Sequence, residues 1–114
     1  MFIYNKMFEL VELVKANDNK HKWEVKLYNT ETKKMNTVKF GAYGMEDYTM
    51  HKDEKRKQLY IQRHSGMNED WTKTGSNTAG FWSRWLLWDK PTIEESLKAL
   101  IKKFKIKIHN PSST

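Results

Sequence analysis

The chain has no cysteine among its 114 residues. A disulfide framework and a thiolate metal site are therefore excluded, and a reducing, intracellular environment is compatible with this composition. The sequence also lacks an apolar run long enough to form a transmembrane helix. Residues 1–10 do not show the basic-then-apolar pattern of a secretory signal. We therefore expect a protein that is neither secreted nor membrane-spanning.

Recognisable catalytic motifs are missing as well. No glycine-rich phosphate-binding loop is present, and Ser83 lacks the flanking glycines of a nucleophile elbow. His51 and His64 are thirteen residues apart, a spacing that matches no zinc or nuclease signature. The sequence therefore predicts a non-enzymatic protein with no catalytic residue, no metal site and no cofactor. The least favoured alternative is a nuclease-like enzyme that uses His51, Asp53 and His64.

Aromatic residues, in contrast, are abundant, with five each of tryptophan, tyrosine and phenylalanine. Such side chains bury large areas, so this short chain is able to build a core. Its length fits one domain. We expect a single domain over residues 1–108 and a flexible tail over residues 109–114.

Positive charge is in excess, with 21 lysines and arginines against 14 acids and a formal net charge of +7. This balance favours acidic partners, such as nucleic acid or an acidic protein. Two interpretations stay open at this point. The charge forms a functional anion-binding surface, or it is a well-solvated lysine-rich surface with no specific ligand.

The first third of the sequence shows the pattern of β-strands. Residues 7–14 are apolar and β-prone, and they end at a cluster of turn-forming residues. Trp23, Val25 and Leu27 then alternate with polar residues, which indicates one buried and one solvated face. The alternation resumes at residues 37–40, after which two glycines break it. These segments predict an antiparallel three-stranded meander.

Helical patterns follow. Charged helix formers dominate residues 51–64, where Asp47 or Thr49 would cap the first turn. Residues 79–88 are apolar nearly all round, which is typical of a buried helix. Both segments end at residues that stop a helix.

The last helix has the clearest start signal. Thr92 and Glu95 form a capping-box pattern, and apolar residues then recur at helical spacing as far as Phe104. Residues 105–108 alternate and predict a short edge strand. The expected fold class is therefore α+β, with an N-terminal three-stranded antiparallel meander packed against about three C-terminal helices.

Polar chemistry is concentrated between Asp47 and His64. Arg56, Tyr60, Arg63 and His64 have helical spacings of three and four residues, so they would share one face. On one interpretation, this face contacts phosphate oxygens. On the other, the two arginines pair with nearby carboxylates and fix the helix to the domain. The carboxylates available for that pairing are Asp47, Asp53 and Glu69.

A second basic segment runs from Lys98 to Lys107 and contains five lysines with no acid between them. It is either a phosphate-binding surface or the solvated face of the last helix. The candidates for nucleic-acid or anion binding are thus His51, Arg56, Arg63, His64, Lys98, Lys102 and Lys103. The candidates for a structural polar network are Asp47, Asp53 and Arg84.

The aromatic residues of the segment 81–88 are separated by leucines, which is more typical of a core than of a platform for bases. A minority of exposed rings would instead anchor a partner protein. The candidates for core or anchor are Trp71, Phe81, Trp82, Trp85 and Trp88.

Two longer motifs combine these residues. They are Phe40-Gly41-Ala42-x-Gly44-x-x-Asp47-Tyr48-Thr49-x-His51-Lys52-Asp53-x-x-Arg56-x-x-x-Tyr60-x-x-Arg63-His64 and Thr78-Ala79-Gly80-Phe81-Trp82-Ser83-Arg84-Trp85-Leu86-Leu87-Trp88-x-Lys90-Pro91-Thr92. Over roughly residues 38–104 the chain resembles a small uncharacterised domain family of giant and other large double-stranded DNA viruses. The resemblance implies a viral protein in the host cytoplasm or the virion. It carries over no catalytic residue.

These observations lead to one expected function and two alternatives. The expected function is that of a non-enzymatic viral accessory or virion-associated protein that binds DNA or RNA through a basic surface. The first alternative is an adaptor or minor capsid component that binds other viral proteins through an aromatic edge near Trp71 and Trp82. The nuclease-like enzyme is the second.

Overall fold

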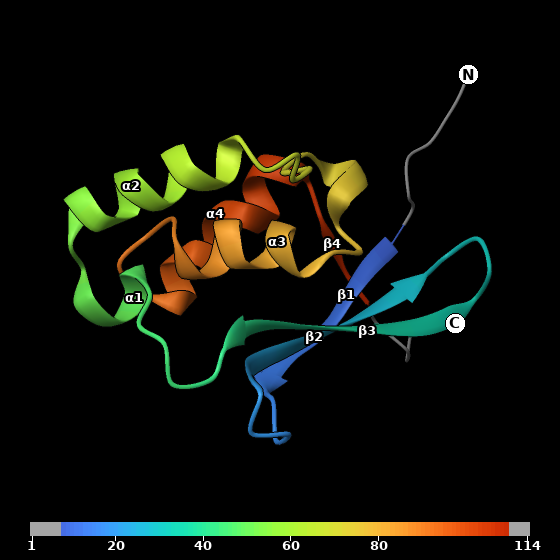
Figure 1. Ribbon diagram of the computed structural model, residues 1–114. Helices are drawn as coiled ribbons and strands as arrows, with labels where there is room; N and C mark the ends of the chain where they lie inside the picture. The colour runs from blue at the N-terminus through green and yellow to red at the C-terminus, as the bar shows by residue number, and fades with distance from the viewer. Residues whose placement is uncertain (1–7, 110–114) are drawn as a thin grey trace.

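The computed structural model describes residues 8–109, which form an α+β domain with the sheet on one side and the helices on the other (Figure 1). Strands β1 (Phe8–Lys15), β2 (His21–Asn29) and β3 (Lys34–Ala42) form an antiparallel meander. The short β4 (Lys107–Ile108) pairs parallel to β1, so the strand order is β3-β2-β1-β4. The predicted meander and the predicted C-terminal edge strand are both confirmed.

The register of the sheet follows the alternation in the sequence. Val25 lies opposite Leu13 on one side and Val38 on the other, and Trp23 lies opposite Phe40. These side chains therefore share the face that packs on the helices. Asp18 shapes the β1–β2 turn, because its carboxylate accepts the backbone N–H groups of Lys20 and His21, each at 2.9 Å. Together these hydrogen bonds and alternating pairs set where each strand begins and which face it buries.

The helix predicted over residues 51–64 consists of two helices, so the prediction of one continuous element was wrong. They are α1 (Tyr48–His51) and α2 (Glu54–Ser65). Lys52 separates them in the left-handed region at φ 55°. Asp47 caps α1 by accepting the N–H of Thr49, and Asp53 caps α2. The chain turns between them because each aspartate starts a helix of its own.

The aromatic segment also departs from a regular helix. It comprises α3 (Ala79–Trp82), capped by Thr78, and a π-helical turn, η2 (Ser83–Leu87). The Trp88 N–H donates to the carbonyl of Ser83 at 3.2 Å and closes this wider turn. A 3-10 turn, η1 (Lys73–Gly75), precedes it. The predicted burial is confirmed for Phe81, Trp82, Leu86 and Leu87, which are at most 2% exposed, whereas Trp85 and Trp88 are partly exposed.

Helix α4 (Ile93–Phe104) begins at the predicted capping box. The Thr92 hydroxyl accepts the Glu95 N–H at 3.1 Å and donates to the Glu95 carboxylate at 3.0 Å. Lys105 ends the helix in the left-handed region at φ 53°. The chain can therefore turn back toward the sheet and form β4 beside β1.

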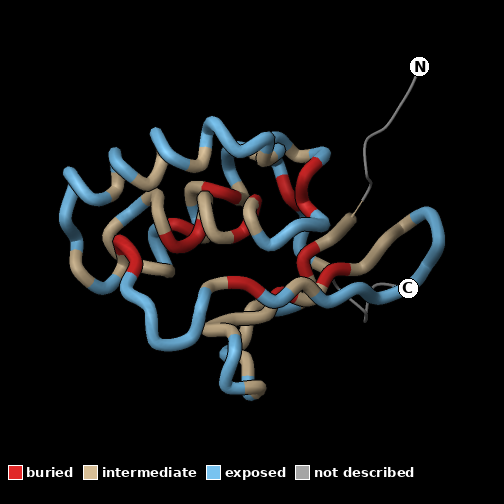
Figure 2. Tube along the Cα trace, in the orientation of Figure 1, coloured by how far each residue is buried: buried red, intermediate tan, exposed pale blue. Residues whose placement is uncertain are grey.

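The core lies between the inner face of the sheet and the layer formed by α3, η2 and α4, where the buried positions of Figure 2 gather. Val25, Phe40 and Leu100 line it with the aromatic segment. None of the helices in residues 8–109 combines the length and apolar character needed to span a membrane. Of the expected tail 109–114, only His109 lies within the described residues, and its ring stacks on Tyr28 with centroids 4.5 Å apart.

Candidate functional site

Helix α2 carries most of the polar candidates and is unusual in having no buried residue. It lies on the outside of the helical layer, where Figure 2 shows only intermediate and exposed positions. The Asp53 carboxylate accepts the N–H groups of Lys55 at 3.0 Å and Arg56 at 3.3 Å, which satisfies the first turn. A helix this polar cannot be held by apolar burial, so side-chain contacts must attach it.

Several polar contacts attach α2 to the domain, among them a hydrogen bond of 3.2 Å from the Tyr48 hydroxyl to the Glu54 carboxylate. Lys57 donates to the carbonyl of Asp89 at 2.7 Å, and the Nδ1 atom of His64 lies 2.9 Å from Glu69. Arg56 pairs with Glu46 at 3.0 Å, rather than with one of the acids expected from the sequence. Those acids are already engaged, Asp47 by Lys22 and Asp53 by the cap of α2.

An aromatic stack supplies the remaining attachment. The ring of Tyr60 lies 4.3 Å from that of Trp88, with an angle of 4° between the planes, and 4.1 Å from that of His64. Burial of Tyr60 raises its pKa, and the carboxylate of Glu69 adds to this effect. The stack therefore joins the middle of α2 to the end of the aromatic segment, 28 residues along the chain.

His51 lies on α1, not on the face of α2, and reaches the same stack from the other side. Its ring is 5.4 Å from Trp88 and 6.3 Å from Tyr48. The Nδ1 atom accepts the backbone N–H of Asp53 at 3.0 Å, so the neutral ring carries its hydrogen on Nε2. That Nε2 atom is buried without a hydrogen-bond partner. His51 thus packs between helices and does not project toward a surface ligand.

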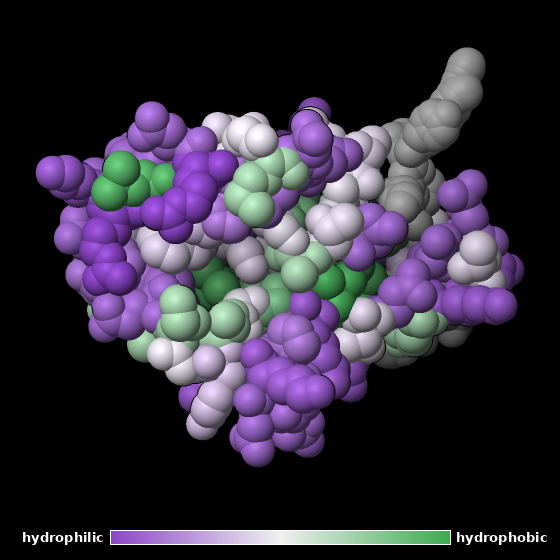
Figure 3. Space-filling view, viewed as in Figure 1, coloured by the Kyte–Doolittle hydropathy of each residue, from purple (hydrophilic) through white to green (hydrophobic). Residues whose placement is uncertain are grey.

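A cleft of about 320 Å³ opens between α2 and the end of the sheet. Tyr60, Arg63 and His64 line it from α2, and Ser83, Leu87 and Trp88 line it from the aromatic segment. The wall on the sheet side is formed by Lys22, Gly41, Ala42, Met45, Glu46 and Asp47. Figure 3 shows hydrophobic atoms recessed between the hydrophilic surfaces of the helices and the sheet.

The charge of this cleft is largely neutralised from within. Lys22 pairs with Asp47 at 2.5 Å, and their side chains are 14% and 3% exposed. His64 and Arg56 have the carboxylate partners described above. Arg63 is exposed and makes no ion pair within residues 8–109. The cleft therefore offers one uncommitted cation to an anion.

Arg84 belongs to a structural network rather than to a surface. Its guanidinium lies 4.3 Å from the ring centroid of Trp85 and 5.5 Å from that of Trp71. Its Nη1 atom donates to the carbonyl of Trp88 at 3.1 Å and lies 3.6 Å from Asp89. Burial lowers the pKa of Arg84, an effect that Asp89 opposes. These contacts close the turn at residues 88–89.

The basic segment at the end of α4 has a different character. We call its five lysines the lysine ridge: Lys98, Lys102, Lys103, Lys105 and Lys107. All five are exposed, and none pairs with a carboxylate in the described part of the chain. Lys103 alone has an aromatic contact, 5.0 Å from the centroid of Trp85. Lys98 and Lys102 are four residues apart and so lie on one side of α4, whereas Lys105 is the residue that ends the helix and Lys107 lies in β4.

The ridge ends at a hollow of about 250 Å³ that brings in a lysine from another element. Lys105 and Lys107 line it together with Lys73 of η1, whose Nζ atom lies 5.6 Å from the ring of Phe8. The one carboxylate lining it, Glu9, lies 2.8 Å from the Nδ1 atom of His109. Sequence reasoning missed Lys73, since it is separated from the ridge by 25 residues and no local spacing relates them.

The aromatic candidates divide between core and surface. Trp82 is 0% exposed, and its indole N–H donates to the carbonyl of Ser76 at 2.6 Å, so it is not available as an exposed partner anchor. Phe81 is equally buried. Trp71, Trp85 and Trp88 are partly exposed but are held by the contacts with Glu69, Arg84 and Tyr60.

Within residues 8–109, no group of three or more histidine, aspartate or glutamate side chains is arranged to hold a metal ion. The residues of the nuclease-like alternative are dispersed between helices. Asp53 caps α2, His51 packs on Trp88, and His64 stacks on Tyr60. The two imidazoles contact different rings of the aromatic stack, His51 that of Trp88 and His64 that of Tyr60.

Comparison with known proteins gives one match. Residues 11–64 match the model of a family described as a family of unknown function (DUF5754). The matched stretch runs from β1 to the end region of α2, so it contains the sheet-side and α2-side walls of the cleft but not the lysine ridge. No curated protein and no solved structure matches the chain. The match fits an uncharacterised domain, and it does not identify the source of the chain.

Proposed function

We propose that this protein is a non-enzymatic accessory protein that binds the phosphate backbone of DNA or RNA through the lysine ridge. The observation that carries this proposal is the set of five exposed lysines with no carboxylate partner in the described residues. Ammonium groups that are not neutralised by the protein are free to replace the counterions of a nucleic acid.

The ridge is a better candidate than the polar face of α2. Among the α2 and α1 candidates, Arg56 and His64 are paired with acids and His51 is packed against Trp88. A phosphate would have to break these contacts before it could bind. Only Arg63 is uncommitted, and it would contribute a single contact at the edge of the cleft.

Lys73 extends the proposed surface beyond one helix. Lysines of η1, α4 and β4 converge on the hollow at the end of the ridge, so a backbone could be contacted from more than one direction. The proposed contacts join ammonium groups to phosphates, and such contacts carry no sequence information directly. We therefore expect binding that depends on salt and is tolerant of sequence.

The proposed source and location of the protein are supported by the sequence resemblance alone. The two motifs resemble a family of giant and other large double-stranded DNA viruses, and on that basis we propose the host cytoplasm or the virion as the location of the activity. Other viral proteins remain the second class of partner. Trp82 is fully buried and cannot contact such a partner, so the aromatic edge would have to consist of other residues.

The proposal can be tested with matched charge-removal variants. Binding of fluorescent single- and double-stranded DNA and RNA is measured at low and physiological salt. The ridge variant is Lys98→Gln/Lys102→Gln/Lys105→Gln. The control, Lys20→Gln/Lys34→Gln/Lys55→Gln, removes the same charge at exposed lysines of the β1–β2 turn, β3 and α2. All six substitutions are on the surface, so both proteins should remain folded.

We expect the ridge variant to lose at least tenfold in affinity and the control to lose much less. Equal losses in the two variants would show that only net charge matters and would remove the ridge as a site. Absence of binding by the unmodified protein at either salt concentration would reject the nucleic-acid function.

A further inference from the structure

We infer that the outer edge of β1, with the groove between it and α4, is a docking site for an extended segment of a partner protein that alternates apolar and basic residues. This inference does not depend on nucleic-acid binding, because it uses a different surface and acidic rather than basic groups. It rests on an incomplete strand edge, an apolar groove and two carboxylates.

The strand edge is incomplete because β4 is very short. It pairs only with Glu9 and Leu10 of β1, and one further bond joins the His109 N–H to the carbonyl of Leu10 at 2.8 Å. Beyond Leu10 no strand of the described chain pairs with this side of β1, although β2 follows the opposite side as far as Lys15. An unpaired edge of this kind is a template for an added strand.

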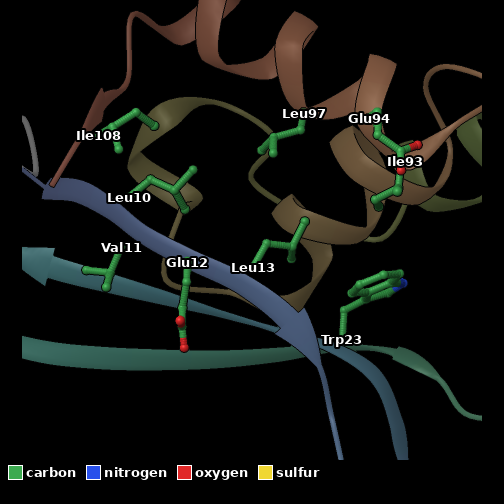
Figure 4. A pocket seen from close by; sticks show the side chains of 9 residues that line it. All are labelled: Leu10, Val11, Glu12, Leu13, Trp23, Ile93, Glu94, Leu97 and Ile108. Carbon is green, nitrogen blue, oxygen red and sulfur yellow. The ribbon is translucent and has the colours of Figure 1, made fainter.

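An apolar groove of about 390 Å³ runs along this edge (Figure 4). Leu10 and Leu13 project into it from β1, and Ile93 and Leu97 face them from α4. Ile108 stands at the end nearest β4 and is 57% exposed. Strand edges in soluble proteins are commonly protected by charge or proline, whereas here leucine and isoleucine side chains line the space beside the edge.

Two carboxylates flank the groove. Glu94 lies on the α4 side and has no ion-pair partner within residues 8–109. Glu12 projects from the other side of β1, where it is 3.4 Å from Lys26 with both side chains well exposed. The chain has a net charge of +7, yet the charged side chains that line this apolar groove are both acidic. They favour a basic ligand and disfavour an acidic one.

The periodicity of a strand determines what the occupant must look like. Successive side chains of an added strand point to opposite faces, so every second residue would enter the groove and contact Leu13 and Leu97. The intervening residues would point to the opposite face of the sheet, from which Glu12 projects. A segment of alternating valine or isoleucine and lysine or arginine satisfies both requirements, while its backbone bonds to residues 11–15 of β1.

The probe is an acetylated and amidated heptapeptide of alternating lysine and valine, added to the full chain labelled with 15N. We expect amide shifts confined to residues 11–15 and 93–97, with saturable binding. Two N-methylated versions of the peptide test strand addition without altering the protein: one carries methyl groups on the backbone nitrogens of its odd-numbered residues, and the other on those of its even-numbered residues. One version should no longer bind, and the other should bind almost as well as the parent peptide, because only one of the two sets of backbone amides faces β1.

Charge is tested separately. A valine–glutamate peptide should bind at least fivefold more weakly than the lysine peptide. The exposed substitution Glu12→Gln, on the face toward which the lysines would point, should weaken lysine-peptide binding about two- to fivefold, the effect of one exposed ion pair. The control Glu95→Gln alters a carboxylate that caps α4 and does not line the groove.

The inference fails if the lysine peptide causes no shifts in residues 11–15, or if both methylated peptides bind as well as the parent. It also fails if the free protein self-associates through these residues, because the occupant would then be a second copy of the chain. Sedimentation of the free protein across a range of concentrations distinguishes that result.

Discussion

The ammonium of Lys22 lies 2.5 Å from the carboxylate of Asp47, and this pair joins the sheet to the start of α1. Asp47 is 2% exposed and also caps α1 through the Thr49 N–H. We expect Asp47→Ala to lower the free energy of unfolding by about 3–5 kcal/mol, since it leaves a largely buried ammonium unpaired. Denaturant unfolding followed by circular dichroism measures this loss.

The matched control is Asp53→Ala, which removes an exposed cap of α2 and should cost about 1 kcal/mol. The double variant Lys22→Met/Asp47→Ala should be more stable than Asp47→Ala alone, because it no longer contains an unpaired charge. Equal losses for Asp47→Ala and Asp53→Ala would show that the ion pair adds nothing beyond capping.

Tyr60 makes the stability of the domain depend on alkaline pH. Its pKa is raised in the folded protein, so the folded state holds this proton more tightly than the unfolded state. The stabilisation is complete below the unfolded tyrosine pKa of about 10 and is lost as the pH rises above it. We expect the denaturant midpoint to fall above this pH, and Tyr60→Phe to reduce the fall. Tyr43→Phe, at a position 64% exposed, should leave it unchanged.

Gly41 and Gly44 both have left-handed backbone conformations, but only Gly41 has a close neighbour, so substitutions at the two positions distinguish the cost of backbone strain from that of a steric clash. Gly41 has φ 78°, and a Cβ there would lie 2.8 Å from Cδ1 of Leu87. Gly44 has φ 86°, with no atom within 4 Å of the added carbon. Gly44→Ala should therefore cost about 1 kcal/mol for strain alone, and Gly41→Ala should cost about 1–3 kcal/mol more. Thermal or denaturant unfolding checks both, and equal costs would contradict the close approach of Leu87.

The salt dependence of nucleic-acid binding reports how many ridge lysines contact phosphates. Each contact with double-stranded DNA contributes about −0.9 to the slope of log K against log salt concentration. Lys102→Gln/Lys105→Gln should therefore make the slope less steep by about 2, and Lys34→Gln/Lys55→Gln should not change it. Fluorescence anisotropy titrations at four or more salt concentrations provide the slopes. An unchanged slope in the ridge variant would place the contacts elsewhere.

Local sequence patterns predicted the elements whose periodicity or cap is encoded within a few residues. The alternation of Trp23, Val25 and Leu27 matches the buried face of β2, and the capping box of Thr92 and Glu95 begins α4. Such patterns are sufficient because the alternation of a strand and the cap of a helix are each visible over two to four positions. The break at Lys52 was not predicted, although Asp53 is a good cap, because the charged residues on both sides of it favour a helix equally.

The candidate sites were decided by contacts between residues far apart in the chain. The sequence contains the basic residues of α2 and of the ridge in similar number, and it does not distinguish them. Only the fold places Glu46 beside Arg56, Glu69 beside His64, and Trp88 beside both Tyr60 and His51. Within residues 8–109 it leaves the ridge lysines without a carboxylate partner. Charge and helical periodicity are therefore properties of the chain, whereas the availability of a charge depends on which partners tertiary packing brings within hydrogen-bonding distance.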